Sequence, residues 1–317
     1  MRLAQMIPIF GVGMLLGWQG LHGTAAAQTS QRERLAIPIY RDTTAFLAPV
    51  RSAISRRIRF HDGTVGVAVL DLTTGERWGV RADERFPSAS LIKVAIMAEV
   101  FERVAEGTLT LTDPLTVLNI DRTGGSGILQ HLKLPLEITV WDAMYLMGAF
   151  SDNVATNVLL AKLGPHAVTQ RMQSYGLANT RMYVRVNGTP EESYDPDSCR
   201  VYGIGATTPL EMATLFERLY HGQVVETDAS AQILWILSYE TFRTGIPRRL
   251  PYEIATAHKT GSFSTSRNDC GVVFGQQRPF VLCVMTKHNR DKRWTLDNDA
   301  VSLIADLALM VYEELNP

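Results

Sequence analysis

Ser90 and Lys93 stand at the start of an apolar run, FPSASLIKVAIMAEVF, that has the spacing of an amphipathic helix. Residues i and i+3 share one face of a helix, so the lysine ammonium can reach the serine hydroxyl. If partial burial lowers its pKa, the lysine can act as a base and the serine as a nucleophile. The ordinary alternative is that Ser88 or Ser90 caps the helix and Lys93 is a surface charge.

Two further motifs could bring polar groups to the same chemistry. SDN at 151–153 lies between two helical runs, and HKTGS at 258–262 lies on a predicted strand. Each has an ordinary explanation, because Ser, Asp and Asn cap helices and glycine marks a bulge or close approach in a strand. A Ser-x-x-Lys pair alone occurs by chance roughly once in a chain of this length. The three motifs together, in this order and at element boundaries, indicate a nucleophilic serine at position 90.

Composition and charge narrow the class of protein. The 317-residue chain has 46% hydrophobic and 20% charged residues, which is enough for a sizeable folded core. A formal net charge of -1 gives no basic footprint for nucleic acid or for an anionic membrane surface. We expect no nucleic-acid partner. Because no metal-binding His/Cys spacing appears, we also expect neither a metal nor a cofactor.

Residues 1–27 have the features of a secretory signal peptide. Arg2 precedes an apolar run from Met6 to Trp18, and the segment ends in three alanines at 25–27. The apolar run is too short and too rich in glycine to span a bilayer of about 30 Å comfortably. We expect cleavage after Ala27 and export of the mature protein to the periplasm or the cell exterior, without a stable membrane anchor.

Three cysteines follow the signal segment: Cys199, Cys270 and Cys283. An odd number in an exported chain leaves at least one thiol free or bonded to another molecule. Cys270 and Cys283 lie in two apolar runs around a predicted hairpin, where they would nearly face each other. A disulfide and a pair of buried thiols are both compatible with this pattern.

The elements that would position the motifs form three blocks. A helix from about residue 41 and two strands around a turn at 73–76 come first, and helical runs fill most of 88–225. Strands then return in 253–287, and a helix is predicted over Asp299–Leu315. This order predicts an α+β fold, an antiparallel sheet flanked by the terminal helices plus an inserted all-α lobe, with a cleft between them. We assign 28–87 and 226–317 to the sheet lobe and 88–225 to the helical lobe.

With these motifs, the chain resembles the class A-type serine β-lactamases and the related penicillin-binding proteins over nearly all of its mature length. Stretches around the motifs are also similar to that family, namely TTGERWGVRADERFPSASLIKV, GGSGILQHL, TTPLEMATLFERLYHG and KTGSFSTSRNDCGVV. The resemblance implies a monomer with the two-lobed β-lactamase/penicillin-binding-protein-like fold, and Ser90 at the base of the cleft.

The resemblance also implies a role for each motif residue. Ser90 would attack a strained lactam carbonyl and form an acyl-enzyme, with Lys93 as the base and Ser151 relaying a proton to the leaving nitrogen. Backbone N–H groups of Ser90 and Ser262 would form the oxyanion hole. Lys259, with Thr260 and Ser262, would hold the substrate carboxylate by charge-assisted hydrogen bonds, and Gly261 belongs to the same substrate-binding strand. Asn153 would orient either Lys93 or the substrate amide. Arg267 would add to carboxylate binding, although a surface arginine explains it equally well.

One position departs from the family pattern. Members that hydrolyse β-lactams quickly carry a loop Glu-x-x-x-Asn, after the SDN motif, whose carboxylate activates the deacylating water. Here that carboxylate would fall near Val186 or Asn187, and neither is a base. The nearest catalytic candidate is Glu191, with Asp195 four residues on and Glu192 as the adjacent alternative. A solvated loop charge explains Glu191 equally well.

We therefore predict an exported, metal-independent serine β-lactamase that opens the lactam ring through an acyl-enzyme on Ser90. The alternative keeps this nucleophile and changes the substrate to that of a D-alanyl-D-alanine peptidase, amidase or esterase with slow deacylation. The expected partner is a small β-lactam or a D-Ala-D-Ala-like peptide. A noncatalytic sensor is a third interpretation, but a pure binder has no need for the combination of Ser90, Lys93, Ser151 and Lys259.

Overall fold

The computed structural model describes residues 45–317. The chain divides into two compact units, residues 1–36 and 37–317, and all of the described residues belong to the second. The predicted signal peptide, residues 1–27, lies outside them. No helix within 45–317 has the length and apolar character needed to cross a membrane.

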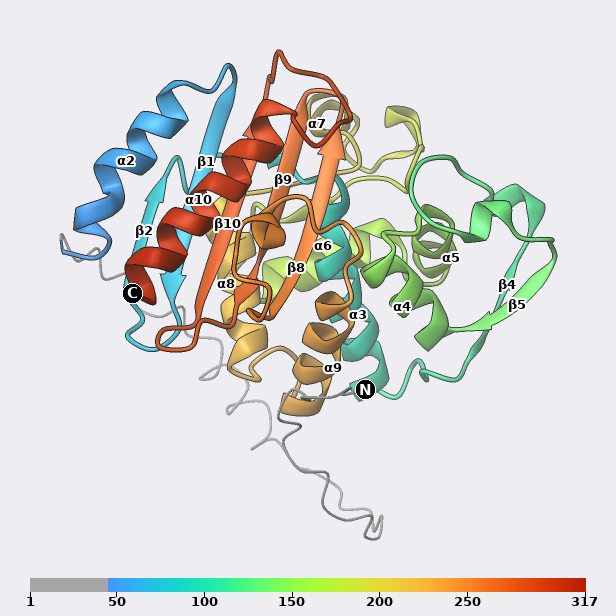
Figure 1. Ribbon diagram of the computed structural model, residues 1–317. Helices are drawn as coiled ribbons and strands as arrows, with labels where there is room; N and C mark the ends of the chain where they lie inside the picture. Colours follow the sequence, from blue (N-terminus) through green and yellow to red (C-terminus); the bar gives the residue numbers. More distant parts are fainter. Residues whose placement is uncertain (1–44) are drawn as a thin grey trace, which may run out of the picture. The chain divides into compact units, whose positions relative to one another are not determined.

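The centre of the fold is a five-stranded antiparallel sheet with the strand order β2-β1-β10-β9-β8 (Figure 1). Its strands are β1 (Thr64–Asp71), β2 (Arg77–Val80), β8 (Thr256–Phe263), β9 (Ser266–Val273) and β10 (Phe280–Lys287). Almost every residue of β1, β9 and β10 is buried. Strands that are buried on both faces require a packed layer on each side of the sheet.

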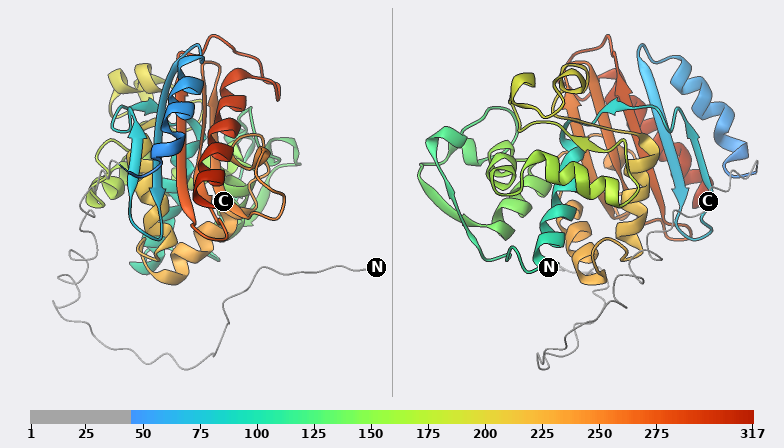
Figure 2. Two further views of the ribbon diagram at one scale, coloured as in Figure 1. Left: turned by 60° about the vertical axis from the view of Figure 1, so that its left-hand side comes forward. Right: turned by 180° about the vertical axis from the view of Figure 1, so that it is seen from behind.

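Helices supply both layers (Figures 1 and 2). The terminal helices α2 (Ala48–Arg59) and α10 (Asp299–Leu315) share an apolar core with Val65, Val67 and Val69 of β1. Gly66, which lies between Val65 and Val67, faces the opposite side of the sheet, where a Cβ would lie 2.8 Å from Pro209 of α8 (Pro209–Tyr220). The twofold alternation of the strand thus places the terminal helices on one face and α8 on the other.

Among the remaining helices, α9 contacts the edge strand β8, as does the turn that precedes α3 (Figure 1). The remaining helices continue from there away from the sheet. They are α3 (Lys93–Ala105), α4 (Val140–Ala149), α5 (Asn153–Leu163), α6 (Pro165–Ser174), α7 (Pro196–Tyr202) and α9 (Thr227–Ser238). Short strands interrupt them: β4 (Pro114–Val117) pairs with β5 (Leu136–Thr139), and β7 (Gly205–Thr207) pairs with both β3 (Phe86–Pro87) and β6 (Arg181–Met182). The predicted α+β class is confirmed. The exact lobe boundaries stay a prediction, and α8, which they assign to the helical lobe, packs on the sheet.

Cys270 and Cys283 occupy paired positions on β9 and β10 and are joined by a disulfide with an S–S distance of 2.00 Å. This structure thus selects one of the two alternatives that the sequence left open. Cys199 is a buried free thiol in α7.

Candidate active site

Ser90 lies in a one-turn 3-10 helix, η1 (Ala89–Ile92), and Lys93 is the first residue of α3 directly after it. Ala89 has a left-handed backbone, with φ of 46°. This conformation costs a non-glycine residue on the order of 1–3 kcal/mol and persists where the surroundings enforce it. Strand β8 packs closely against this turn, because a Cβ on Gly261 would lie 3.1 Å from the Ser90 nitrogen and 2.6 Å from the Ser88 carbonyl oxygen. Glycine at 261 lets the strand approach the nucleophile's backbone this closely.

Lys93 is fully buried, and its ammonium group is held by the SDN motif. Nζ donates hydrogen bonds to the Ser151 carbonyl oxygen at 2.7 Å, to Ser151 Oγ at 3.1 Å and to Asn153 Oδ1 at 2.9 Å. The structure therefore brings together three of the predicted residues, and it excludes the interpretation of Lys93 as a solvated surface charge.

The pKa of Lys93 is lowered well below the ordinary lysine value, chiefly because burial disfavours the charged ammonium. The nearby cation of Lys259 lowers it further, whereas the carboxylates of Glu240 and Asp152 raise it. A lysine with a lowered pKa can exist as the neutral amine that a general base must be.

Asp152, the middle residue of the SDN motif, fixes the positions of its neighbours. One carboxylate oxygen accepts two backbone N–H groups in the first turn of α5 at 2.9 and 3.0 Å, and the other accepts two from the loop at 128–129 at 2.7 and 2.9 Å. The motif is thus a helix cap, as its ordinary explanation holds. The cap also holds Ser151, which has a left-handed φ of 52°, and Asn153 in place around Lys93.

Ser90, Ser151 and Asn153 line one side of a cleft of about 1050 Å³. Thr260, Gly261 and Ser262 of β8 line the other side, together with Arg267 at the start of β9. The cleft is of the size that takes a small molecule. Within residues 45–317, no three His, Cys, Asp or Glu side chains gather as a metal-binding group.

Lys259 differs from the substrate-facing role that the resemblance implies. Its side chain is fully buried, and its ammonium forms an ion pair with Glu240, whose carboxylate is also fully buried. The sequence predicted a contact with the substrate carboxylate, whereas the structure pairs this cation within the protein. Glu240 was not among the predicted site residues, because nothing in its local sequence pattern marks it.

Arg267 lies at the cleft with its side chain buried. Its guanidinium donates to the backbone carbonyls of Phe263, Ser266 and Arg293 and stacks on the Trp294 ring, 4.2 Å from the centroid. Burial lowers the pKa of Arg267. Within 45–317 its guanidinium forms no salt bridge to a carboxylate, while the negative charge of Asp291 opposes the effect of burial by raising its pKa.

Glu191 is not brought to the cleft. Its side chain is 70% exposed and pairs with Arg200 at 3.2 Å. The two neighbouring carboxylates have partners of their own. Glu192 forms an ion pair with Arg185 at 3.2 Å, and Asp195 caps the N-terminus of α7. The structure therefore corrects the prediction of Glu191 as the water-activating base: this charge belongs to a solvated loop.

Val186 and Asn187 line the cleft at the place where the family's carboxylate was expected. Val186 is fixed there by the Asn157 side chain, which accepts from its N–H at 2.9 Å and donates to its carbonyl oxygen at 3.1 Å. The two positions to which the resemblance assigned the carboxylate thus present an aliphatic side chain and a carboxamide to the cleft.

Comparison with known proteins identifies the family. A model of the beta-lactamase enzyme family matches residues 49–315. The chain belongs to the beta-lactamase enzyme family. A beta-lactamase of Streptomyces fradiae is 31% identical over 86% of this chain and 89% of its own length, and one of Streptomyces lavendulae is 30% identical over 90% and 98%.

Solved structures agree with this assignment. A beta-lactamase from Sphaerobacter thermophilus has a TM-score of 0.75 and 27% identity, covering 85% of this chain and 97% of that one. PBP-A has a TM-score of 0.75 and 27% identity, covering 88% and 98%. A mutant of PBP-A, with a TM-score of 0.74 and 28% identity over 88% and 98% of the two chains, was solved as its acyl-enzyme with penicillin-G. The predicted class A-like serine hydrolase family is confirmed.

Acylation should require the neutral form of Lys93. With its pKa lowered by burial, we expect the acylation rate to rise with pH through that pKa and to level off above it. Lys93→Arg keeps a cation that cannot lose its proton, so acylation should fall about 10²- to 10⁴-fold. Stopped-flow acylation by a chromogenic cephalosporin across the pH range of the folded protein measures both effects, with circular dichroism as the folding control. A pH-independent rate together with an active Lys93→Arg variant would contradict the role.

Proposed function

We propose that this member of the beta-lactamase family is a serine hydrolase that opens the β-lactam ring through an acyl-enzyme on Ser90. The observation that carries the proposal is the buried Lys93, hydrogen-bonded to Ser151 and Asn153 in the cleft that Ser90 also lines. Ser90 Oγ attacks the lactam carbonyl and loses its proton to Lys93. As the C–N bond breaks, Ser151 gives its hydroxyl proton to the leaving nitrogen and takes the proton that Lys93 received, so that Lys93 is neutral again and an ester remains on Ser90.

Removal of the acyl group is the slow step in this proposal. Among the described residues that line the cleft, the single carboxylate is Asp269. Both of its oxygens are engaged, one with His258 Nδ1 and the other with the Ile246 N–H, each at 2.8 Å. Since Val186 offers no proton acceptor, no carboxylate at the expected position activates a water molecule.

This slow step favours a second candidate function that uses the same nucleophile. A D-alanyl-D-alanine peptidase, amidase or esterase acylated by β-lactams would turn them over slowly and hold the adduct. The similarity to PBP-A, over 98% of that chain, supports this candidate alongside the β-lactamase one. We also propose that the protein is exported as a monomer to the periplasm or beyond. The pattern of residues 1–27 supports export, and the resemblance to the family supports the monomer.

Ser90→Ala removes the hydroxyl that attacks the carbonyl and should abolish adduct formation. Because the change deletes one atom at the cleft surface, the melting temperature should move little. Labelling with a fluorescent penicillin, followed by denaturing electrophoresis, measures the adduct, and Ser264→Ala on the β8–β9 turn is a matched control that should label fully. Labelling of Ser90→Ala at the wild-type rate would overturn the nucleophile assignment.

Val186→Glu should speed deacylation, because it places a carboxylate on a backbone that Asn157 already fixes at the cleft. We expect about a 10²-fold rise or more in the deacylation rate, as is typical of a positioned general base. Val186→Gln is the matched control, similar in size but without a base, and should leave that rate near the wild-type value. Equal rates in the two variants would show that the missing carboxylate does not limit turnover.

A further inference from the structure

The Lys259–Glu240 pair joins the KTG strand to the segment that follows α9. Both side chains have 0% exposure, and the carboxylate contacts the ammonium directly. A buried ion pair is internally neutral, whereas a buried ion without its partner costs several kcal/mol. Each member therefore requires the other, and the charge of Lys259 is matched before any substrate enters the cleft.

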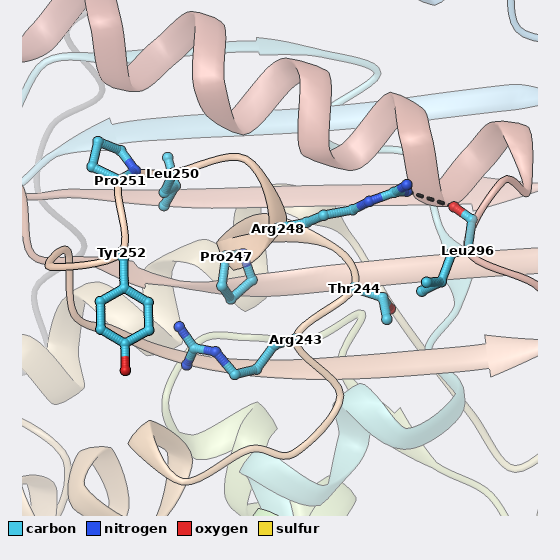
Figure 3. A pocket seen from close by; sticks show the side chains of 8 residues that line it. All are labelled: Arg243, Thr244, Pro247, Arg248, Leu250, Pro251, Tyr252 and Leu296. Carbon is cyan, nitrogen blue, oxygen red and sulfur yellow. Dashed lines mark hydrogen bonds between the residues drawn. The ribbon is translucent and has the colours of Figure 1, made fainter.

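Glu240 is held in place by its own segment. Thr241 N–H donates to the Ala149 carbonyl oxygen at 2.9 Å, and Ile246 N–H donates to Asp269 at 2.8 Å. Farther along, the Arg248 guanidinium donates to the Leu296 carbonyl oxygen beside a hollow of about 450 Å³ (Figure 3). Hydrogen bonds thus hold this segment both before and after its residues that line the cleft. Glu240 is thereby fixed in position beside β8.

An anionic substrate would have to compete with this carboxylate for Lys259. The attraction between opposite charges is strongest in a desolvated site, and Glu240 already occupies that position. The hydroxyls of Thr260 and Ser262 at the cleft remain available to a substrate carboxylate. Arg267 also lines the cleft, but backbone carbonyls hold its guanidinium, which forms no salt bridge to a carboxylate within 45–317.

We propose that Glu240 is a specificity-determining residue that removes Lys259 from anion recognition, so that the cleft accepts acyl donors with or without a carboxylate beside the reacting carbonyl. The substrate class thus includes neutral esters and amides as well as anionic lactams. This inference rests on the proposed acylation of Ser90 and adds the charge requirement of the substrate. Glu240 acts through Lys259, so its effect should appear in the choice between substrates.

A penicillin and its methyl ester test this directly, because they differ in the charge of one group. The quantity measured is the ratio of their second-order acylation rate constants, acid over ester. In the wild type we expect a ratio below about tenfold. Glu240→Gln frees the Lys259 cation and should raise the ratio about tenfold, equivalent to about 1.4 kcal/mol. A purely structural role for Glu240 would slow both substrates equally and leave the ratio unchanged, which would overturn the inference.

The double variant Glu240→Gln/Lys259→Gln removes both charges and leaves no unpaired buried ion, so it tests the proposal even if the single variant does not fold. We expect the acid-over-ester ratio of this double variant to stay within about threefold of the wild-type ratio. That change is smaller than the tenfold rise, about 1.4 kcal/mol, expected for Glu240→Gln alone. A larger fall in the acid-over-ester ratio of this variant would show that Lys259 binds the substrate carboxylate and would overturn the inference.

Arg77→Gln/Glu217→Gln is the matched control, since it removes another buried ion pair, between β2 and α8, from residues that do not line the cleft. Its ratio should equal that of the wild type. If neither the penicillin nor its ester acylates the wild-type protein, the proposed function itself fails, and that result is distinct from any change in the ratio.

Discussion

Two fully buried lysines, Lys93 and Lys259, impose the constraint on which the site depends. An ammonium without water must be hydrogen-bonded, paired or neutral. The fold satisfies the two lysines differently. Lys93 receives only uncharged acceptors, the oxygens of Ser151 and Asn153, and its pKa is lowered, whereas Lys259 receives the carboxylate of Glu240. One lysine is thereby suited to lose its proton, and the other has its charge compensated within the protein.

The surrounding elements place these two lysines close to each other. Strand β8 brings Lys259 in from the sheet, and its glycine at 261 lets it pack against the backbone of Ser90. Helix α5 begins at the Asp152 cap, which sets Ser151 and Asn153 around Lys93 from the opposite side. The cleft lies between these two groups of elements. Backbone hydrogen bonds and close packing therefore set the positions of its reactive side chains.

The sequence predicted the part of this arrangement that local pattern encodes. The chemistry of the site needs fixed residue types at short spacings, which makes Ser90, Lys93, the SDN motif and the KTG strand recognisable. The final helix was predicted with the same bounds that the structure shows. The partner of Lys259 was not predictable, because Glu240 lies 19 residues away along the chain and only the tertiary fold brings it near. The error on Glu191 has the same cause, since a loop carboxylate near the right position in sequence can point to solvent.

Acylation and deacylation are separable properties of this one site. Acylation uses groups that the structure assembles, while deacylation lacks a carboxylate at Val186. Intact-protein mass spectrometry of the wild-type protein, sampled after mixing with a chromogenic cephalosporin whose product is followed in parallel, tests this claim most directly. We expect a single adduct, located on Ser90, that persists after a burst of about one product per protein. Rapid multiple turnover without an accumulating adduct would contradict it.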